Sequence, residues 1–80
     1  RIYYNQGVST LDKANSISDA TQYKQEKAKA EELFRKALPF FEKARELKPD
    51  EKEFLIGLRG IYYNLNMNEK FDEIEAEMNK

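Results

Sequence analysis

Apolar residues recur at helical spacing from the first residues of the chain. Tyr4, Val8 and Leu11 are separated by four and then three positions, which is the spacing of one face of an α-helix. The pattern predicts a first amphipathic helix of about four turns that begins near Ile2.

A polar segment, residues 15–21 (NSISDAT), separates this helix from the next and is the predicted turn. Asp19, with Gln22 three positions later, resembles a capping box that opens the second helix. Ser16 and Ser18 are the alternative caps.

The second predicted helix carries the longest apolar stripe in the chain. Its small and aromatic members alternate at steps of four and three, namely Ala30, Phe34, Ala37, Phe41 and Ala44. Leu33, Phe40 and Leu47 widen the stripe, and we expect the whole face to be buried. Pro39 falls inside the pattern and removes the hydrogen bond to the carbonyl of Arg35. Because the stripe continues in register through Pro39, we expect a kink there, with two separate helices as the alternative.

The next helix boundaries are marked by proline and by capping residues. Pro49 ends the second helix, and Asp50, with Glu53 three residues later, predicts a capping box for the third. Asn66 is a candidate left-handed residue at the end of that helix. Asn68 is the predicted N-cap of a short last helix.

The third and fourth predicted helices also have one apolar side. In the third it comprises Phe54, Leu55, Leu58, Ile61, Tyr62 and Leu65, and in the fourth Phe71, Ile74 and Met78. Gly57 and Gly60 interrupt the third helix, where each costs about 1 kcal/mol against alanine. Two glycines on one side indicate a close approach of another chain segment or an open groove wall. Four helices and an all-α fold are therefore expected.

Composition limits the size and the chemistry of the fold. Eighty residues with 40% hydrophobic residues suit one small domain over residues 1–80. The chain contains no Cys, His or Trp, which excludes disulfides, the common zinc sites and all His-dependent catalytic triads. A net charge of −1, with bases and acids mixed, disfavours nucleic acid as a partner.

The ends of the sequence leave its location open. No run of 18 apolar residues exists, so we expect no membrane insertion. The chain starts at Arg1, which suggests an excised fragment whose signal peptide, if there was one, is not visible. A soluble chain in the cytoplasm or in a bacterial periplasm fits equally.

Several of these residues form a pattern found in a known family. Inside ALPFFEKARELKP (37–49), the spacing of Ala37, Phe41, Ala44 and Pro49 resembles the second helix of a tetratricopeptide repeat. LIGLRGIYYNLN (55–66) looks like the first helix of a following repeat. IYYNQGVS (2–9) resembles the start of the preceding one, with Gly7 as its small contact residue. Taken together, the sequences of residues 36–55 and 61–74 look like the C-terminal end of bacterial proteins of this kind.

The resemblance implies a right-handed α-solenoid fragment of antiparallel helix hairpins. Residues 1–49 would form a first repeat, and residues 50–80 a second repeat that caps the stack at its C-terminal end. Gly7 and Pro49 are 42 positions apart, a separation that exceeds the family's repeat length of about 34 residues. The first hairpin is therefore expected to be elongated, with a projecting tip and a first helix that runs further than its periodicity.

Adjacent tyrosines divide between core and surface in this interpretation. Neighbouring residues on a helix point about 100° apart, and we expect Tyr3 and Tyr62 in the core, with Tyr4 and Tyr63 facing elsewhere. In the family the first helix of each repeat lines a concave groove. Transfer by motif places Tyr4, Asn5, Val8, Leu11, Asp12, Ile56, Gly60, Tyr63 and Asn64 there. The alternative is that these residues pack against a neighbouring repeat.

Other chemistry finds little support in the sequence. The C-terminal acids lack the spacing and the glycine of a calcium loop; they are Glu69, Asp72, Glu73, Glu75 and Glu77. Gly57 and Gly60 are not followed by the Lys-Ser or Lys-Thr of a phosphate loop. We therefore expect no catalytic, cofactor-binding or metal-binding residues and no cofactor.

Together these expectations describe a non-enzymatic protein–protein interaction module. A bacterial tetratricopeptide-like scaffold would bind a peptide or a partner helix in its concave groove. The groove positions include no Lys, so the two-carboxylate clamp of chaperone-binding members is not expected. The alternative is a structural unit that caps a longer repeat array or self-associates through an exposed N-terminal face.

Overall fold

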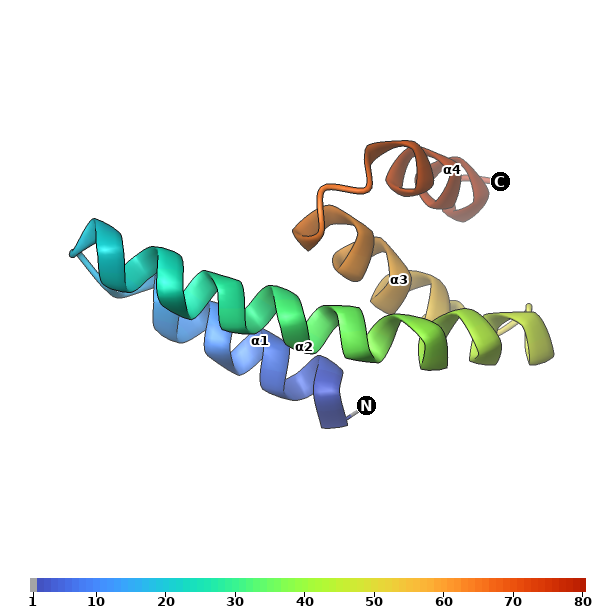
Figure 1. Cartoon of the computed structure of the whole chain (residues 1–80). Coiled ribbons are helices and arrows are strands. Elements are labelled where there is room, and N and C mark those ends of the chain that lie inside the picture. The colour runs from blue at the N-terminus through green and yellow to red at the C-terminus, as the bar shows by residue number, and fades with distance from the viewer. Residues whose placement is uncertain (1) are drawn as a thin grey trace.

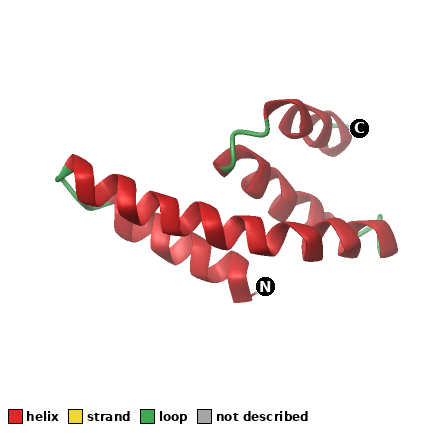
Figure 2. Cartoon of the chain, viewed as in Figure 1, coloured by secondary structure: helices red, strands yellow, loops and turns green. Residues whose placement is uncertain are grey.

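The computed structural model of this chain describes residues 2–80 and consists of four α-helices joined by short connections (Figure 1, Figure 2). The helices are α1 (Ile2–Asn15), α2 (Ala20–Leu47), α3 (Lys52–Asn64) and α4 (Asn68–Met78). Within the described part there is no strand. Each helix packs on the next, α1 on α2, α2 on α3 and α3 on α4. The predicted all-α class with four helices is confirmed.

Small residues bring α1 and α2 together as an antiparallel pair (Figure 1). Ala14 of α1 and Ala30 of α2 are both fully buried near the tip of the hairpin. Further along, Gly7 lies against Phe34, and a Cβ added at Gly7 would stand 3.0 Å from Cε1 of that ring. The two helices can approach closely because each of these positions has a small residue on at least one of the two helices.

The second helix is unusually long and is shared by the two halves of the fold. It runs unbroken through Pro39 for 28 residues, against 14 for α1. The prediction of one continuous helix rather than two is confirmed. α1 lies along its first part, whereas α3 crosses its second part (Figure 1). The expected extension of the first helix is wrong, because α1 ends at Asn15 and the extra length of the hairpin lies in α2.

Phe41 of α2 is the point at which three helices meet. Its ring centroid lies 5.2 Å from that of Tyr4 on α1 and 6.3 Å from that of Phe54 on α3. Gly57 of α3 sits directly over the ring, since a Cβ at this position would fall 2.2 Å from Cε2 of Phe41. This is the close approach that the glycines in the third helix predict.

The rest of the core joins α3 to its neighbours on both sides. Leu58 and Ile61 are fully buried, and Ile74 of α4 is 3% exposed. Phe71 and Met78 pack against the same cluster from α4. The predicted inner faces of the third and fourth helices are confirmed.

Two of the predicted cap residues are confirmed. Oδ1 of Asp19 accepts a hydrogen bond from the backbone N–H of Gln22 at 3.0 Å. Asn66 has a φ of 59°, the left-handed conformation that ends many helices. The N–H of Met67 then bonds the carbonyl of Tyr62 at 2.9 Å, as in a Schellman motif.

The predicted caps of the last two helices are wrong. The residue before α3 is Glu51, which forms no side-chain cap bond, and Asp50 lies one position outside. The backbone bond from Phe54 N–H to the Glu51 carbonyl sets this start. Asn68 is the first helical residue of α4, because the turn after α3 already positions Met67 as its N-cap.

Two predictions about burial are also wrong. Phe40 and Leu47 are 64% and 69% exposed, because α1 and α3 cover only the centre of the apolar stripe on α2. In α1 the two tyrosines exchange their expected places. Tyr4 packs against Phe34 and Phe41, whereas Tyr3, expected in the core, is 39% exposed.

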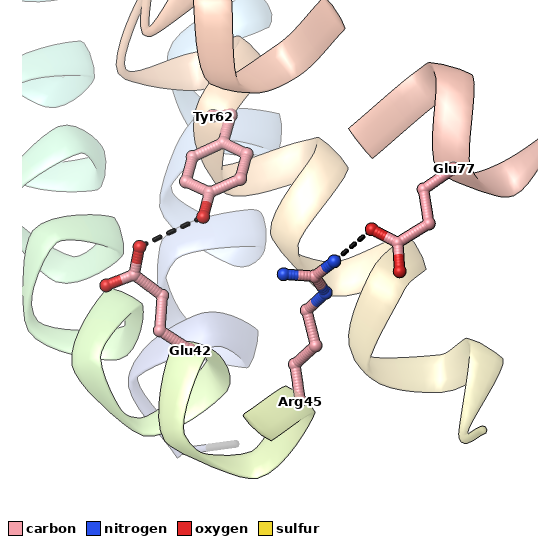
Figure 3. A network of polar contacts seen from close by, with 4 residues as sticks. All are labelled: Glu42, Arg45, Tyr62 and Glu77. Carbon is pink, nitrogen blue, oxygen red and sulfur yellow. Dashed lines mark hydrogen bonds and ion pairs between the residues drawn. The ribbon is translucent and has the colours of Figure 1, made fainter. Parts of the chain in front are cut away.

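A group of polar and charged side chains links α2 with α3 and α4 (Figure 3). The hydroxyl of Tyr62 donates to Oε2 of Glu42 at 2.9 Å, and Arg45 pairs with Glu77. Nζ of Lys70 lies 3.8 Å from the same Glu42 oxygen. Tyr62 is 6% exposed, and its burial, followed by the bond to Glu42, raises its pKa to about 12.

The contact between Gly57 and Phe41 predicts opposite responses to alanine at the two glycines of α3. For Gly57→Ala we expect a net loss of about 1 to 2 kcal/mol, because the overpacking cost exceeds the gain in helix propensity. Gly60→Ala is the matched control, since its Cβ would meet only the Tyr4 hydroxyl at 3.3 Å. This variant should be unchanged or up to about 1 kcal/mol more stable. Urea unfolding monitored by circular dichroism measures both, and equal stabilisation by the two alanines would contradict the packing at Phe41.

The raised pKa of Tyr62 predicts a loss of stability at high pH. Below pH 10, the ordinary tyrosine pKa, the buried neutral hydroxyl contributes fully, and between pH 10 and about 12 this contribution disappears. Its size is of the order of 1 kcal/mol, because Glu42 is partly open to solvent and screening reduces the effect. The free energy of unfolding of wild type should therefore fall more steeply across this interval than that of Tyr62→Phe. Parallel falls in the two proteins would show that Tyr62 is not the group involved.

Candidate partner-binding groove

A groove opens between α1 and α3 on one side of the molecule. Its volume is about 260 Å³, and it is lined by Tyr4, Asn5, Phe41, Glu53, Ile56 and Gly57. α1 contributes the first two residues, α2 contributes the phenylalanine and α3 contributes the last three. The groove thus joins segments that are about 50 residues apart in the sequence.

The floor of the groove is formed by the helix junction at Phe41. Because Gly57 has no side chain, the Phe41 ring lies directly beneath the α3 backbone. The Tyr4 ring stands beside it and is held from the other side by Phe34, with ring centroids 5.9 Å apart at an edge-on angle of 68°. Gly60 leaves space for the Tyr4 hydroxyl. These contacts fix the aromatic wall of the groove.

The chemistry of the groove is that of an apolar slot with a polar edge. Ile56 is 49% exposed, so its side chain stands at the edge of the groove with half of its surface available. Asn5 is exposed and offers both a donor and an acceptor. Glu53 lines the α3 side. The arrangement can bury one apolar side chain and hydrogen-bond the backbone beside it.

The structure brings together only some of the predicted groove residues. Tyr4, Asn5 and Ile56 line the same groove, and Gly60 adjoins Tyr4. Leu11 packs against the core from further along α1. Val8 and Asp12 are exposed on that helix but do not line the groove.

The remaining two predicted residues lie at the end of α3 and have local contacts. Tyr63 is 68% exposed and its ring lies 5.8 Å from that of Phe71 on α4. The amide of Asn64 donates to the carbonyl of Gly60 at 2.8 Å. Neither residue lines the groove beside Tyr4 and Ile56.

Three residues that line the groove were not among the predicted groove residues. Phe41 belonged to the predicted core, and it serves as both core and floor. Glu53 was assigned to a capping box that does not form. Gly57 carried the relevant signal, because a glycine inside a helix that other residues favour often marks a close approach.

A second hollow, of about 490 Å³, lies over the charged group between α2 and α4 (Figure 3). Its lining includes Glu42, Arg45, Tyr62, Lys70 and Glu77. Tyr62 and Lys70 both contact Glu42, and Arg45 pairs with Glu77. With its pKa raised to about 12, Tyr62 remains a neutral hydrogen-bond donor below that pH. The hollow is therefore a polar junction between helices.

Residues 2–80 contain no group of three or more His, Cys, Asp or Glu side chains that could hold a metal ion. None of the four helices combines the length and the apolar character needed to cross a membrane.

The chain was also compared with known proteins. No family model, no curated protein and no solved structure matches it. The groove is therefore interpreted from its own geometry and chemistry.

Proposed function

We propose that this chain is a non-enzymatic interaction module that binds an extended peptide or a partner helix in the groove between α1 and α3. The observation that carries the proposal is the half-exposed Ile56 beside the Tyr4 and Phe41 rings, at a site formed by three helices. Exposed apolar surface that continues into a hollow is typical of interaction sites, whereas a single exposed apolar residue is not.

The size of the groove favours a peptide over a small molecule. Sites that enclose a drug-sized ligand usually measure about 300 to 1,000 Å³ and bury most of the ligand surface. This groove is about 260 Å³ and open to one side. It suits one apolar anchor residue of a longer chain, while Asn5 at its edge supplies hydrogen bonds to the peptide backbone.

The arrangement of the helices supports the proposed relation to tetratricopeptide repeats. α1 and α3, the first helices of the two proposed repeats, form the sides of the groove, while α2 and α4 are the second helices. In this interpretation the chain is the C-terminal part of a solenoid, with α3 and α4 as the capping repeat. The length of α2 distinguishes the first repeat from a standard one.

A structural role is the alternative, and exposed side chains on α1 favour it. Ile2 is 71% exposed and Val8 is 36% exposed. Upstream repeats or a second copy of the chain would cover them in a longer array. Leu11 and Tyr4 carry less weight for this alternative, since both already pack against the core.

Substitution of one groove residue tests the peptide-binding proposal. Peptides of about 12 residues are selected from a random display library on the wild-type protein, and their affinities are measured by fluorescence anisotropy. Ile56→Asp should weaken them at least about tenfold by placing a carboxylate against the apolar slot. Asn5→Ala should weaken them about fivefold through the loss of one hydrogen bond.

Tyr63→Asp is the matched control for this experiment. It adds the same charge at another exposed apolar residue of α3, outside the groove, and should leave peptide affinity unchanged. If no peptide is enriched, or if Ile56→Asp binds the peptides as wild type does, the proposal is wrong. A molar mass from light scattering that doubles with concentration would support the self-association alternative.

A further inference from the structure

One side of α2 carries a line of apolar residues that the fold covers only in part. Phe40 is 64% exposed, Leu47 is 69% exposed and Leu33 is half-buried. The three residues are seven positions apart and therefore lie along one line of the helix. We call this line, together with the lysines described next, the outer seam of α2.

Lysines follow the apolar residues at the same spacing. Lys29, Lys36 and Lys43 are also seven positions apart. Lys36 lies four residues before Phe40, and Lys43 lies three residues after it. In heptad terms, Leu33, Phe40 and Leu47 are d positions, and Lys36 and Lys43 are g positions. The a positions Ala30 and Ala37 are buried in the core, so a partner helix reaches only the d and g residues. In coiled coils, charges at the g positions choose the partner.

Tyr3 of α1 fixes the centre of the outer seam. Its ring is stacked on that of Phe40, with centroids 6.4 Å apart at 28°. Nζ of Lys36 lies 5.7 Å from the centroid of the Tyr3 ring, within the range of a cation–π contact. A rigid aromatic pair beside a held lysine loses little conformational entropy when a partner covers it.

The two lysines beside Phe40 are not neutralised by ion pairs within the described part of the fold. Glu26 is paired with Lys29 at 2.9 Å, and Glu32 is paired with Arg35 at 3.3 Å. Among residues 2–80, no carboxylate forms an ion pair with Lys36 or Lys43. The two lysines that flank Phe40 therefore remain available to acidic groups of a partner.

We propose that the outer seam of α2 is a second docking surface, which binds an amphipathic helix of another protein. That helix carries a row of apolar residues with glutamate or aspartate beside it. Its apolar row covers Leu33, Phe40 and Leu47, and its acids pair with Lys36 and Lys43. The contact is independent of the groove between α1 and α3, because the two surfaces share no residue.

A second copy of the chain fits the outer seam poorly. In an antiparallel pair, Lys36 and Lys43 of one copy face the same lysines of the other, and like charges at these positions are unfavourable. The acids on the exposed side of α4 also lack a matching apolar row. Glu69 and Asp72 stand there beside Ala76 as the exposed apolar residue, which is too small to cover Phe40.

An anionic lipid surface is also a poorer match. Helices that lie in a membrane interface have a broad apolar face and a basic polar face. The apolar line on α2 is one side chain wide, and Glu31 and Glu46 are among the polar residues of this helix. A narrow line with charge on one edge matches another helix better than a bilayer.

Two designed peptides test this proposal. Each has about four heptads with Leu at positions a and d; one has Glu at e and g, and the other has Lys there. Neither peptide pairs with itself at neutral pH, because like charges oppose it. Isothermal titration with the chain should show binding of the Glu peptide at least about tenfold tighter than that of the Lys peptide. The difference should shrink as salt rises from about 0.05 to 0.5 M.

Variants of the chain locate the binding surface. Phe40→Ala should weaken the Glu peptide at least about tenfold without changing the melting temperature, since Phe40 is largely exposed. The double variant Lys36→Glu, Lys43→Glu should reverse the preference in favour of the Lys peptide. Tyr63→Ala is the matched control, because it truncates a similarly exposed aromatic residue that lies on α3 outside both surfaces, and it should leave both affinities unchanged.

Four outcomes would overturn the proposal. They are equal binding of the two peptides, no binding of either peptide, a concentration-dependent dimer that Phe40→Ala abolishes, and co-sedimentation with phosphatidylserine vesicles that the Glu peptide does not inhibit. The third would assign the outer seam to a second copy, and the fourth would assign it to lipid. Because Ile56→Asp and Phe40→Ala act on separate surfaces, failure of this proposal and failure of the groove proposal are distinguishable.

Discussion

The contact of Phe41 with Gly57 determines how the two halves of this fold meet. Burial of one phenylalanine stabilises a protein by about 1.5 to 3 kcal/mol, a large share of what a domain of this size retains. The ring reaches its position because α3 offers bare backbone there. Tyr4 then packs beside the ring from α1, and the groove inherits its floor and one wall from this junction. The candidate site is thus a direct result of core packing.

Periodicity predicts the helices well and their burial less well. The repeat of apolar residues, the cap at Asp19 and the left-handed Asn66 are local features, and the structure confirms them. The width of the buried stripe on α2 depends on how α1 and α3 lie against it, which no local pattern contains. For this reason Phe40 and Leu47 were expected inside and are exposed. The burial of Tyr4 in place of Tyr3 has the same origin, because the positions of Phe34 and Phe41 on α2 decide which of the two tyrosines packs in the core.

Prediction of the groove shows a similar division. Tyr4, Asn5 and Ile56 were assigned to the groove from the resemblance of their segments to the first helices of two repeats, and they meet in space. Tyr63 and Asn64 continue the same side of α3 but lie beyond the reach of α1, where Phe71 and the carbonyl of Gly60 are their neighbours. The resemblance therefore selected three residues that line one hollow, but the crossing of α1, α2 and α3 decides how far that hollow extends.

The long α2 has a consequence for how the molecule unfolds. In repeat arrays whose units each have their own helices, the units can open one at a time. Here one unbroken helix contributes to the cores of both hairpins. Fraying of its centre would expose Phe34 and Phe41 together and release α1 and α3 in a single event. The shared helix therefore couples the opening of the two hairpins.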